Sequence, residues 1–410
     1  MTILRRLRRQ IAIFFAVIGP GFITAMVDND AGGIYTYSQA GARWGYLPLW
    51  TLLPIMLVLV VTQEMGARMS AVTGKGLSDL IREEFGFRTT FFVMLALLGV
   101  NLANVMANFA GIATSLELFG VPRWVSVPLG AAAVWLLVVK GTYRVVEKIF
   151  LLACGFYVAY VAAGILARPD WAEAAFSSVR PRLILDDAYV AMLIGMVGTS
   201  VAPWMQFYLQ AAVVEKGIDE KQYRESRVEV VVGCVVMTLI AFFIVVACAG
   251  AYRHHPRDIS SAAEAALALR PFGRWASLLF SAGLFNASLF AACILPLSTA
   301  YSVCEGLGFE SGVNKRFAEA PVFYWLYTSL IVAGAAVVLI PSFPLVRLIL
   351  VSQILNGCLL PVILIFMLLL ANRRDLLGQW TNSRLYNAVA WTAAAVMISL
   401  SLSLAGLSVV

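Results

Sequence analysis

The sequence predicts a polytopic all-α membrane protein, and its composition and the length of its apolar runs support that prediction. Of the 410 residues, 61% are hydrophobic and 13% are charged, whereas soluble domains are about 45–50% apolar and about 25% charged. A soluble fold could not cover this much apolar surface, and disordered chains are polar and rich in charge. In the strands of a transmembrane barrel, apolar and polar residues alternate over about 10 residues. The apolar runs in this sequence reach about 20 residues and do not alternate with polar residues.

Eleven apolar runs each approach the length that a helix needs to cross about 30 Å of hydrocarbon. We expect a single transmembrane domain over residues 1–410, because the longest polar stretches have only the length of loops. The runs lie at about 11–34, 47–72, 89–118, 123–140, 146–167, 188–214, 228–252, 275–303, 320–341, 344–371 and 386–409.

Basic residues gather in alternate loops, on the same side as the arginines at 5–9. The positive-inside rule therefore predicts a multi-pass protein of the cell (inner) membrane with a cytoplasmic N-terminus and an outside C-terminus. The net charge of +7 does not indicate nucleic-acid binding, since the basic residues lie between apolar runs without interleaved aromatic residues. The six cysteines form no CxxC pair and are interpreted as small core residues. We expect a monomer in the lipid bilayer, with no cofactor.

Ten of the eleven runs can be divided into two related halves, as in many secondary transporters. The first repeat would cover about 11–167 and the second about 188–371, with an extra helix at about 386–409. In such proteins the first helix of each half is interrupted near the membrane midplane. The first and sixth runs are therefore where interruptions are expected.

The first run contains acids, an amide and a glycine pair inside an otherwise apolar span, where residues 27–33 read Val-Asp-Asn-Asp-Ala-Gly-Gly. A charge at the bilayer centre costs about 3 kcal/mol on insertion scales, so these acids need a cation, water or a protein partner. Glycines let the backbone open, and freed carbonyls beside a carboxylate make a hard-oxygen cation site. We expect Asp30 to be a ligand and Asp28 to line the approach. The alternative is that the acids pair with a buried arginine such as Arg68.

The sixth run contains Gly-Thr-Ser-Val-Ala-Pro at residues 198–203. Pro203 has no backbone N–H and clashes with the preceding turn, so a second interruption is expected, with carbonyls freed near Thr199 and Ala202. The alternative is an ordinary helix with a proline kink.

The first run carries Gly-Pro-Gly-Phe at 19–22, followed by Asp-Ala-Gly-Gly at 30–33. These motifs resemble the first helix of the NRAMP divalent-metal transporters, where Gly-Pro-Gly-Phe precedes Asp-Pro-Gly-Asn, and further segments resemble later helices in the family's order. The resemblance covers helices 1 to 10 and implies a LeuT-like fold of five plus five inverted helices, with a transition-metal site between helices 1 and 6. The further matching segments are Gln63, 67–68, 73–77, 143–148, 352–353 and 360–361.

The departures from the family motifs are specific. Gly33 stands where the family has asparagine, and Ala202 and Trp204 stand where it has methionine and histidine. An ungapped match also puts Asn104 and Ala107 at an aspartate and a glutamate of the third helix. The pattern resembles a branch of the family, the NRAMP-related magnesium transporters.

Losing the methionine thioether and the asparagine side chain leaves a larger, oxygen-only pocket. Mg²⁺ dehydrates reluctantly and usually keeps several waters, so the expected substrate is partly hydrated Mg²⁺, or Mn²⁺, which oxygen ligands also suit. The expected metal-site residues are Asp28, Asp30, Gly33, Thr199, Ala202 and Gln353.

Transport without proton coupling is expected, because titratable groups within the spans are few. The chain's two histidines, His254 and His255, both lie in a loop. The alternatives are a proton-coupled Mn²⁺/Fe²⁺ transporter of the NRAMP type, an amino-acid or amine carrier in which Trp204 forms a cation–π wall, and a channel. A membrane enzyme is not expected, because two loop histidines cannot supply a catalytic cluster within the spans.

Overall fold

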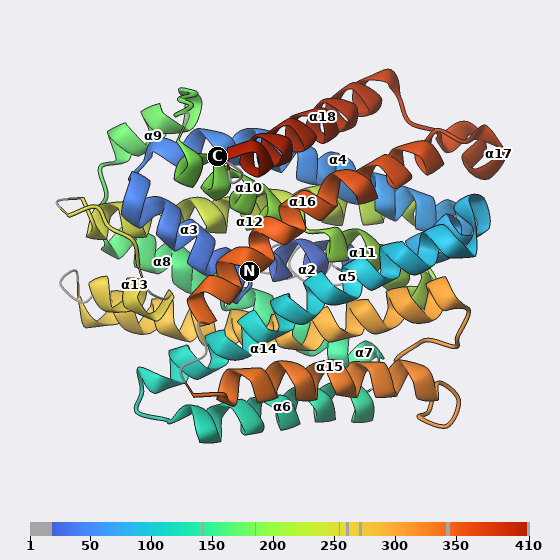
Figure 1. Ribbon diagram of the computed structural model, residues 1–410, viewed down its shortest axis with the longest axis horizontal. Coiled ribbons are helices and arrows are strands. Elements are labelled where there is room, and N and C mark those ends of the chain that lie inside the picture. The colour runs from blue at the N-terminus through green and yellow to red at the C-terminus, as the bar shows by residue number, and fades with distance from the viewer. Residues whose placement is uncertain are drawn as a thin grey trace, which may run out of the picture.

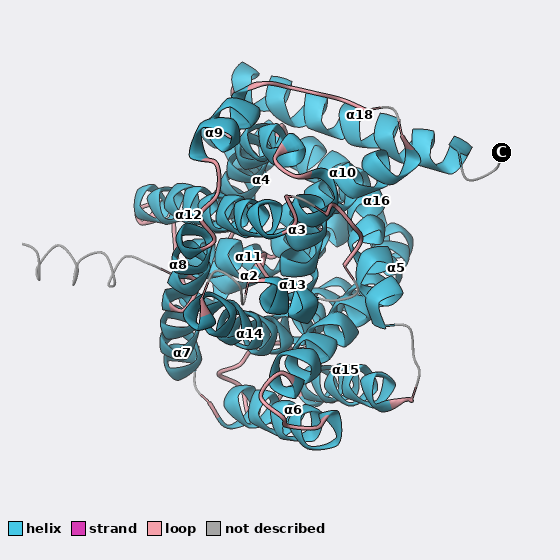
Figure 2. Cartoon of the chain, turned by 90° about the vertical axis from the view of Figure 1, so that its left-hand side faces the viewer, coloured by secondary structure: helices cyan, strands magenta, loops and turns pink. Residues whose placement is uncertain are grey.

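The computed structural model describes residues 19–141, 143–184, 186–253, 255–259, 262–269, 273–341 and 345–407, and all regular elements within them are helices (Figure 1). Most helices run alongside one another, and a view along them places α2, α3 and α11 in the middle of the bundle (Figure 2). The α-helices are α2 (Pro20–Val27), α3 (Ala31–Trp44), α4 (Leu52–Thr73), α5 (Leu77–Glu117), α6 (Arg123–Lys140), α7 (Tyr143–Gly155), α8 (Val158–Leu166), α9 (Trp171–Val179), α10 (Asp187–Ser200), α11 (Pro203–Lys216), α12 (Tyr223–Ala251), α13 (Ala262–Ala268), α14 (Arg274–Leu307), α15 (Pro321–Leu339), α16 (Leu345–Ala371), α17 (Arg374–Leu377) and α18 (Arg384–Leu407). Two 3₁₀ turns, η1 (Leu47–Thr51) and η3 (Gly378–Trp380), complete the elements.

The apolar runs of the sequence correspond to helices or helix pairs. In the described part of the chain, nine helices are long and apolar enough to cross a membrane. The first run is divided between α2 and α3, and the last run is α18. Residues 11–18 of the first run, the arginines at 5–9, His254 and residues 408–409 lie outside the described residues.

α5 is kinked at Gly86, whose φ of +82° and ψ of 165° are not helical and suit glycine. A polar segment from Leu77 precedes the kink, and the apolar span follows it, so this span begins close to the expected residue 89. The sequence reading missed α9, which begins where the Asp170 side chain accepts a hydrogen bond from the Glu173 N–H.

The outer surface of the bundle is apolar. α6 and α15 pack side by side at one edge (Figures 1 and 2), and Trp124, Leu129 and Trp325 on these helices are exposed. Large apolar side chains that face outward on long helices are typical of a lipid-facing surface.

The interior helices are closely packed around the two short pairs α2–α3 and α10–α11. α12 packs against α2, α3 and α4, and α5 packs along α14. α10 meets α16 where Gly198 faces Gly357, and a Cβ atom on either glycine would lie within 2.7 Å of the opposite helix's backbone. These contacts bring α16 and α5 alongside the helix ends at the centre.

Candidate functional site

The first helix is interrupted at the expected residues. α2 ends at Val27 and α3 begins at Ala31, with Asp30 extended (φ −76°, ψ −173°) as the N-cap of α3. Its Oδ1 accepts a hydrogen bond of 2.8 Å from the Gly33 N–H. The carboxylate therefore lies at the positive end of the α3 dipole.

Asn108 of α5 holds the other carboxylate oxygen of Asp30. Its Nδ2 donates to Asp30 Oδ2 over 2.8 Å, and its Oδ1 accepts from the Ala31 N–H over 3.1 Å. Asp30 is 5% exposed, so these bonds supply its polar partners from within the protein.

Asp28 lies at the same break without such partners. Its side chain is 2% exposed, and neither carboxylate oxygen has a hydrogen-bond partner among the described residues. The neighbouring Asn29 anchors the break, because its Nδ2 donates to the Met237 carbonyl over 3.2 Å and its own carbonyl accepts from the Tyr157 hydroxyl over 3.2 Å.

The sixth helix is also interrupted, so the expectation of a second break is confirmed and the alternative of a simple proline kink is wrong. α10 ends at Ser200, α11 begins at Pro203, and Val201 between them is non-helical (φ −130°, ψ 57°). Ala202 is the N-cap of α11 and makes no side-chain cap. Tyr37 of α3 shares a hydrogen bond of 2.6 Å with Ser200, which ties the two interrupted helices together.

The glycine pair at 32–33 lets three segments meet at the first break. A Cβ atom on Gly33 would lie 2.5 Å from the Asp28 carbonyl oxygen and 3.1 Å from Thr199 Oγ1, and one on Gly32 would collide with the Gln353 amide. Asp28, Thr199 and Gln353 are therefore brought to one place. A side chain at Gly33 would meet the Asp28 carbonyl oxygen and Thr199 Oγ1, so oxygen atoms fill the position beside this glycine.

Amide side chains continue the polar region beside Gln353. Asn356 donates to Gln353 Oε1 over 3.1 Å, and Asn104 donates to Asn356 Oδ1 over 3.1 Å. The sequence reading did not assign a role to Asn108 or Asn356. The apolar run of α5 contains three asparagines at spacings of three and four, Asn101, Asn104 and Asn108. This spacing places them on one helix face, so the sequence did indicate a polar face on this helix.

Arg68 does not pair with either acid of the break, so that alternative is wrong. Its side chain forms an ion pair with Glu64 (3.3 Å) and donates to the Trp380 carbonyl and Asn382 Oδ1, each over 2.5 Å. Tyr223 also donates to Glu64. This network fixes α4 to the segment before α18 and leaves Asp28 and Asp30 without a cationic partner from Arg68.

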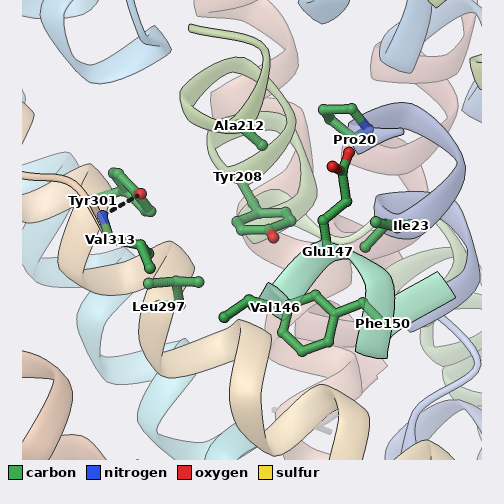
Figure 3. Close-up of a pocket in the computed structure, with 10 residues that line it drawn as sticks. All are labelled: Pro20, Ile23, Val146, Glu147, Phe150, Tyr208, Ala212, Leu297, Tyr301 and Val313. Carbon is green, nitrogen blue, oxygen red and sulfur yellow. Dashed lines mark hydrogen bonds between the residues drawn. The ribbon is translucent and has the colours of Figure 1, made fainter. Parts of the chain in front are cut away.

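A small cavity lies beside the start of α2, on the face of α11 that carries Tyr208 and Ala212 (Figure 3). Its volume of about 10 Å³ has room for about one water molecule. Glu147 borders it and forms an ion pair of 2.8 Å with Lys216.

At the opposite end of the bundle, residues 257–259 form a strap across the end of α3. Asp258 accepts hydrogen bonds from Gln39 and from Arg43 (2.9 Å). The Ile259 N–H donates to Gln39 Oε1 over 2.8 Å, and the Tyr35 hydroxyl donates to the Ile259 carbonyl over 2.9 Å. The strap thus joins the α12–α14 connection to the first interrupted helix.

The atoms around the breaks that could bind a metal ion are oxygen atoms of carboxylate, hydroxyl, amide and backbone groups. Among the described residues, no three His, Cys, Asp or Glu side chains form a metal-binding group. Such oxygen donors suit hard divalent cations.

Comparisons with known proteins agree with this architecture. The profile of the Nramp family (natural resistance-associated macrophage protein-like) matches residues 21–406. The divalent metal cation transporter MntH of Deinococcus radiodurans is 28% identical over 402 residues, covering 94% of this chain and 88% of that protein. The MntH of Granulibacter bethesdensis is 25% identical, covering 94% and 87%.

Solved structures share the fold. The Eremococcus coleocola manganese transporter, in complex with an aromatic bis-isothiourea substituted compound, has a TM-score of 0.73 at 20% identity over 94% of this chain and 85% of that chain. A Na⁺-coupled sialic acid symporter has a TM-score of 0.62 at 12% identity over 93% and 90%. These likenesses confirm the LeuT-like all-α fold.

Nramp proteins are transporters, which confirms the expectation of a multi-pass membrane transporter rather than an enzyme. The profile match over residues 21–406, on a chain with the two interrupted helices described above, shows that this protein belongs to the Nramp family.

Proposed function

We propose that this protein imports divalent metal cations, with Mg²⁺ and also Mn²⁺ as substrates, and that it belongs to the magnesium-transporting branch of its family. Its relatives are divalent metal cation transporters by name, and a structural neighbour is a manganese transporter. Transport of the same class of ion by this chain is the simplest function for the site.

The observation that carries the proposal is Asp30, buried at the first break and oriented by Gly33 and Asn108. Oxygen atoms of Asp28, Thr199, Ala202 and Gln353 complete the proposed site, and Gly33 supplies the N–H that orients Asp30. Ala202 offers a methyl group where a thioether would attract softer cations. An oxygen-only site favours an ion that keeps part of its hydration shell.

We propose that transport runs without proton coupling. Asn108 and Asn104, which face the site from α5, carry amides that do not titrate, and Trp204 stands at the start of α11. A membrane potential contributes about 2.3 kcal/mol per charge per 100 mV, so a divalent ion gains about twice that. The potential and the ion gradient therefore suffice to drive uptake.

The chain's arrangement in the membrane is part of the proposal. The repeats would span about 11–167 and 188–371, followed by the extra helix at 386–409. The N-terminus would be cytoplasmic, the C-terminus outside, and the functional unit a monomer in the bilayer. The distribution of Lys and Arg along the sequence supports the orientation.

Flux measurements on the reconstituted full chain test the function. Proteoliposomes should take up Mg²⁺ and Mn²⁺, a negative inside potential should speed uptake, and a lumenal pH dye should report no acidification with metal influx. Uptake should vanish in Asp30→Ala. A wild-type protein that carries Cd²⁺ but no Mg²⁺, or that acidifies the lumen as metal enters, would contradict the proposal.

A further inference from the structure

Three buried glutamines on α4 and α11 have no hydrogen-bond partner among the described residues. Gln63, Gln206 and Gln210 are each 0% exposed, and both polar atoms of each amide are unpaired. Buried amides in proteins nearly always have partners. The six polar atoms of these amides have no partner among the described residues and are therefore open to water or to a ligand.

The three amides share one interface. The Nε2 atom of Gln210 lies 3.5 Å from the position that a Cβ on Gly66 would take, so Gln210 contacts α4 at Gly66. Gln206 precedes Gln210 by four residues and Gln63 precedes Gly66 by three, so each lies one turn back on the same helix face.

α4 and α11 run in the same direction, so the turn of α4 with Gln63 and the turn of α11 with Gln206 lie at the same height along the bundle. Gly76, after the end of α4, lies against Glu305 in the last turn of α14. Glu215, in the last turn of α11, accepts a hydrogen bond of 3.0 Å from Asn314, shortly after α14. Both helices therefore end at the same end of the bundle, and Gln63 and Gln206 lie near each other.

This amide cluster begins close to the proposed ion site. α11 starts at the second break, and Gln206 and Gln210 follow Ala202 by four and eight residues, or about 6 and 12 Å along the helix axis. The cluster therefore extends from the break toward Lys216. The other face of α11, which carries Tyr208, borders a cavity with room for about one water molecule (Figure 3).

We propose that Gln63, Gln206 and Gln210 form a second cation position, which a hydrated divalent ion occupies after it leaves the Asp30 site. This inference rests on the proposed function. Amide carbonyls are hard oxygen ligands, and they accept hydrogen bonds from an ion's retained waters. Because the amides are neutral, they bind the ion weakly, and conduction through successive sites requires binding weak enough for release.

The test compares full-length Gln206→Leu/Gln210→Leu with wild type in Mn²⁺ uptake, Mn²⁺ binding and thermal unfolding. Leucine removes the amides at similar volume. We expect the maximal uptake rate to fall about tenfold, equivalent to about 1.4 kcal/mol in the barrier. The affinity for Mn²⁺ at the Asp30 site should change by less than about twofold, because the two substitutions leave the residues of that site in place. Thermal stability should stay equal or rise, because leucine leaves no unpaired polar atoms.

A matched control replaces an amide that does have a protein partner. Asn286 donates to the Ala153 carbonyl over 2.9 Å, so Asn286→Leu should lower thermal stability and leave the uptake rate unchanged. Wild-type uptake rates in the double glutamine variant, or a loss of stability and affinity together, would overturn the second cation position, since the latter pattern indicates a structural role.

A gain-of-binding variant separates this inference from the proposed function. Gln206→Glu places a carboxylate in the cluster, so an Mn²⁺ titration should show a second bound ion per chain. In uptake measurements the same variant should release Mn²⁺ more slowly than wild type. If this variant binds no additional Mn²⁺, the second position is refuted even where Asp30-dependent transport is intact. If wild type transports neither Mg²⁺ nor Mn²⁺, the proposed function is wrong. The number of Mn²⁺ ions bound per chain of Gln206→Glu still decides whether the second cation position exists.

Discussion

The side-chain amide of Asn108 lies 2.8 Å from the Asp30 carboxylate and also accepts a hydrogen bond from the Ala31 N–H. One residue of α5 therefore orients both the acid and the first turn of α3. The position of α5 is in this way coupled to the position of the charge at the first break.

Removing that amide should weaken ion binding. In Asn108→Leu, Asp30 loses a charge-assisted hydrogen bond worth about 1.5–3 kcal/mol, so its carboxylate is less well oriented. Mg²⁺ affinity, measured by calorimetry, should fall about tenfold or more. Asn108→Gln tests whether a displaced amide restores binding. Unchanged affinity in Asn108→Leu would show that Asp30 does not depend on α5.

Neutralising Asp30 should abolish transport without unfolding the protein. Asn in Asp30→Asn keeps an oxygen that accepts the Gly33 N–H but loses the acceptor of the Asn108 amide, so thermal stability should fall by at most about 1.5–3 kcal/mol and the protein should stay folded. The site loses its charged ligand, and Mg²⁺ uptake into proteoliposomes should drop to the background of empty vesicles. Substantial uptake in this variant would place the ion elsewhere.

A methyl group at Gly33 should disturb the site, whereas one at Gly99 should not. In Gly33→Ala the new Cβ meets the Asp28 carbonyl at 2.5 Å, and relieving such overpacking costs about 1–3 kcal/mol. Thermal stability and Mg²⁺ affinity should both decrease.

The matched control is Gly99→Ala. No atom lies within 4 Å of a Cβ at that exposed position in α5, so the helix should gain about 0.5–1 kcal/mol. Equal behaviour of the two variants would mean that the close approach at Gly33 carries no strain.

A thioether at Ala202 should change ion selectivity. In Ala202→Met the N-cap of α11 gains a soft ligand, so the affinity for Cd²⁺ relative to Mg²⁺ should rise about tenfold. Ala202→Leu has similar bulk and no sulfur, and it should lower uptake of both ions without changing their ratio. Competition of Cd²⁺ with Mg²⁺ uptake measures the difference, and identical ratios in the two variants would exclude Ala202 from the site.

The interruptions could be predicted from the sequence because glycines, a proline and buried acids mark them locally. Asp30 and Thr199 were expected at the breaks for the same reason, and Gln353 was expected from the resemblance of its segment to the family's tenth helix. The partners of these residues could not be predicted, since the rotation of α5 and α4 about their axes decides that Asn108 meets Asp30 and that Gln63 faces α11. The close contact at Gly33 could not be predicted either, because the sequence does not show that the Asp28 carbonyl oxygen lies where a side chain would begin.

The strap at 257–259 joins the second half of the chain to α3 through Gln39, Tyr35 and Arg43. Its Asp258 and Arg43 side chains are 62% and 37% exposed, so dissolved ions screen their attraction. Parting α3 from the strap at that end of the bundle would break these few contacts together. Salt on that side of the bundle should therefore weaken the electrostatic part of the link between the strap and α3.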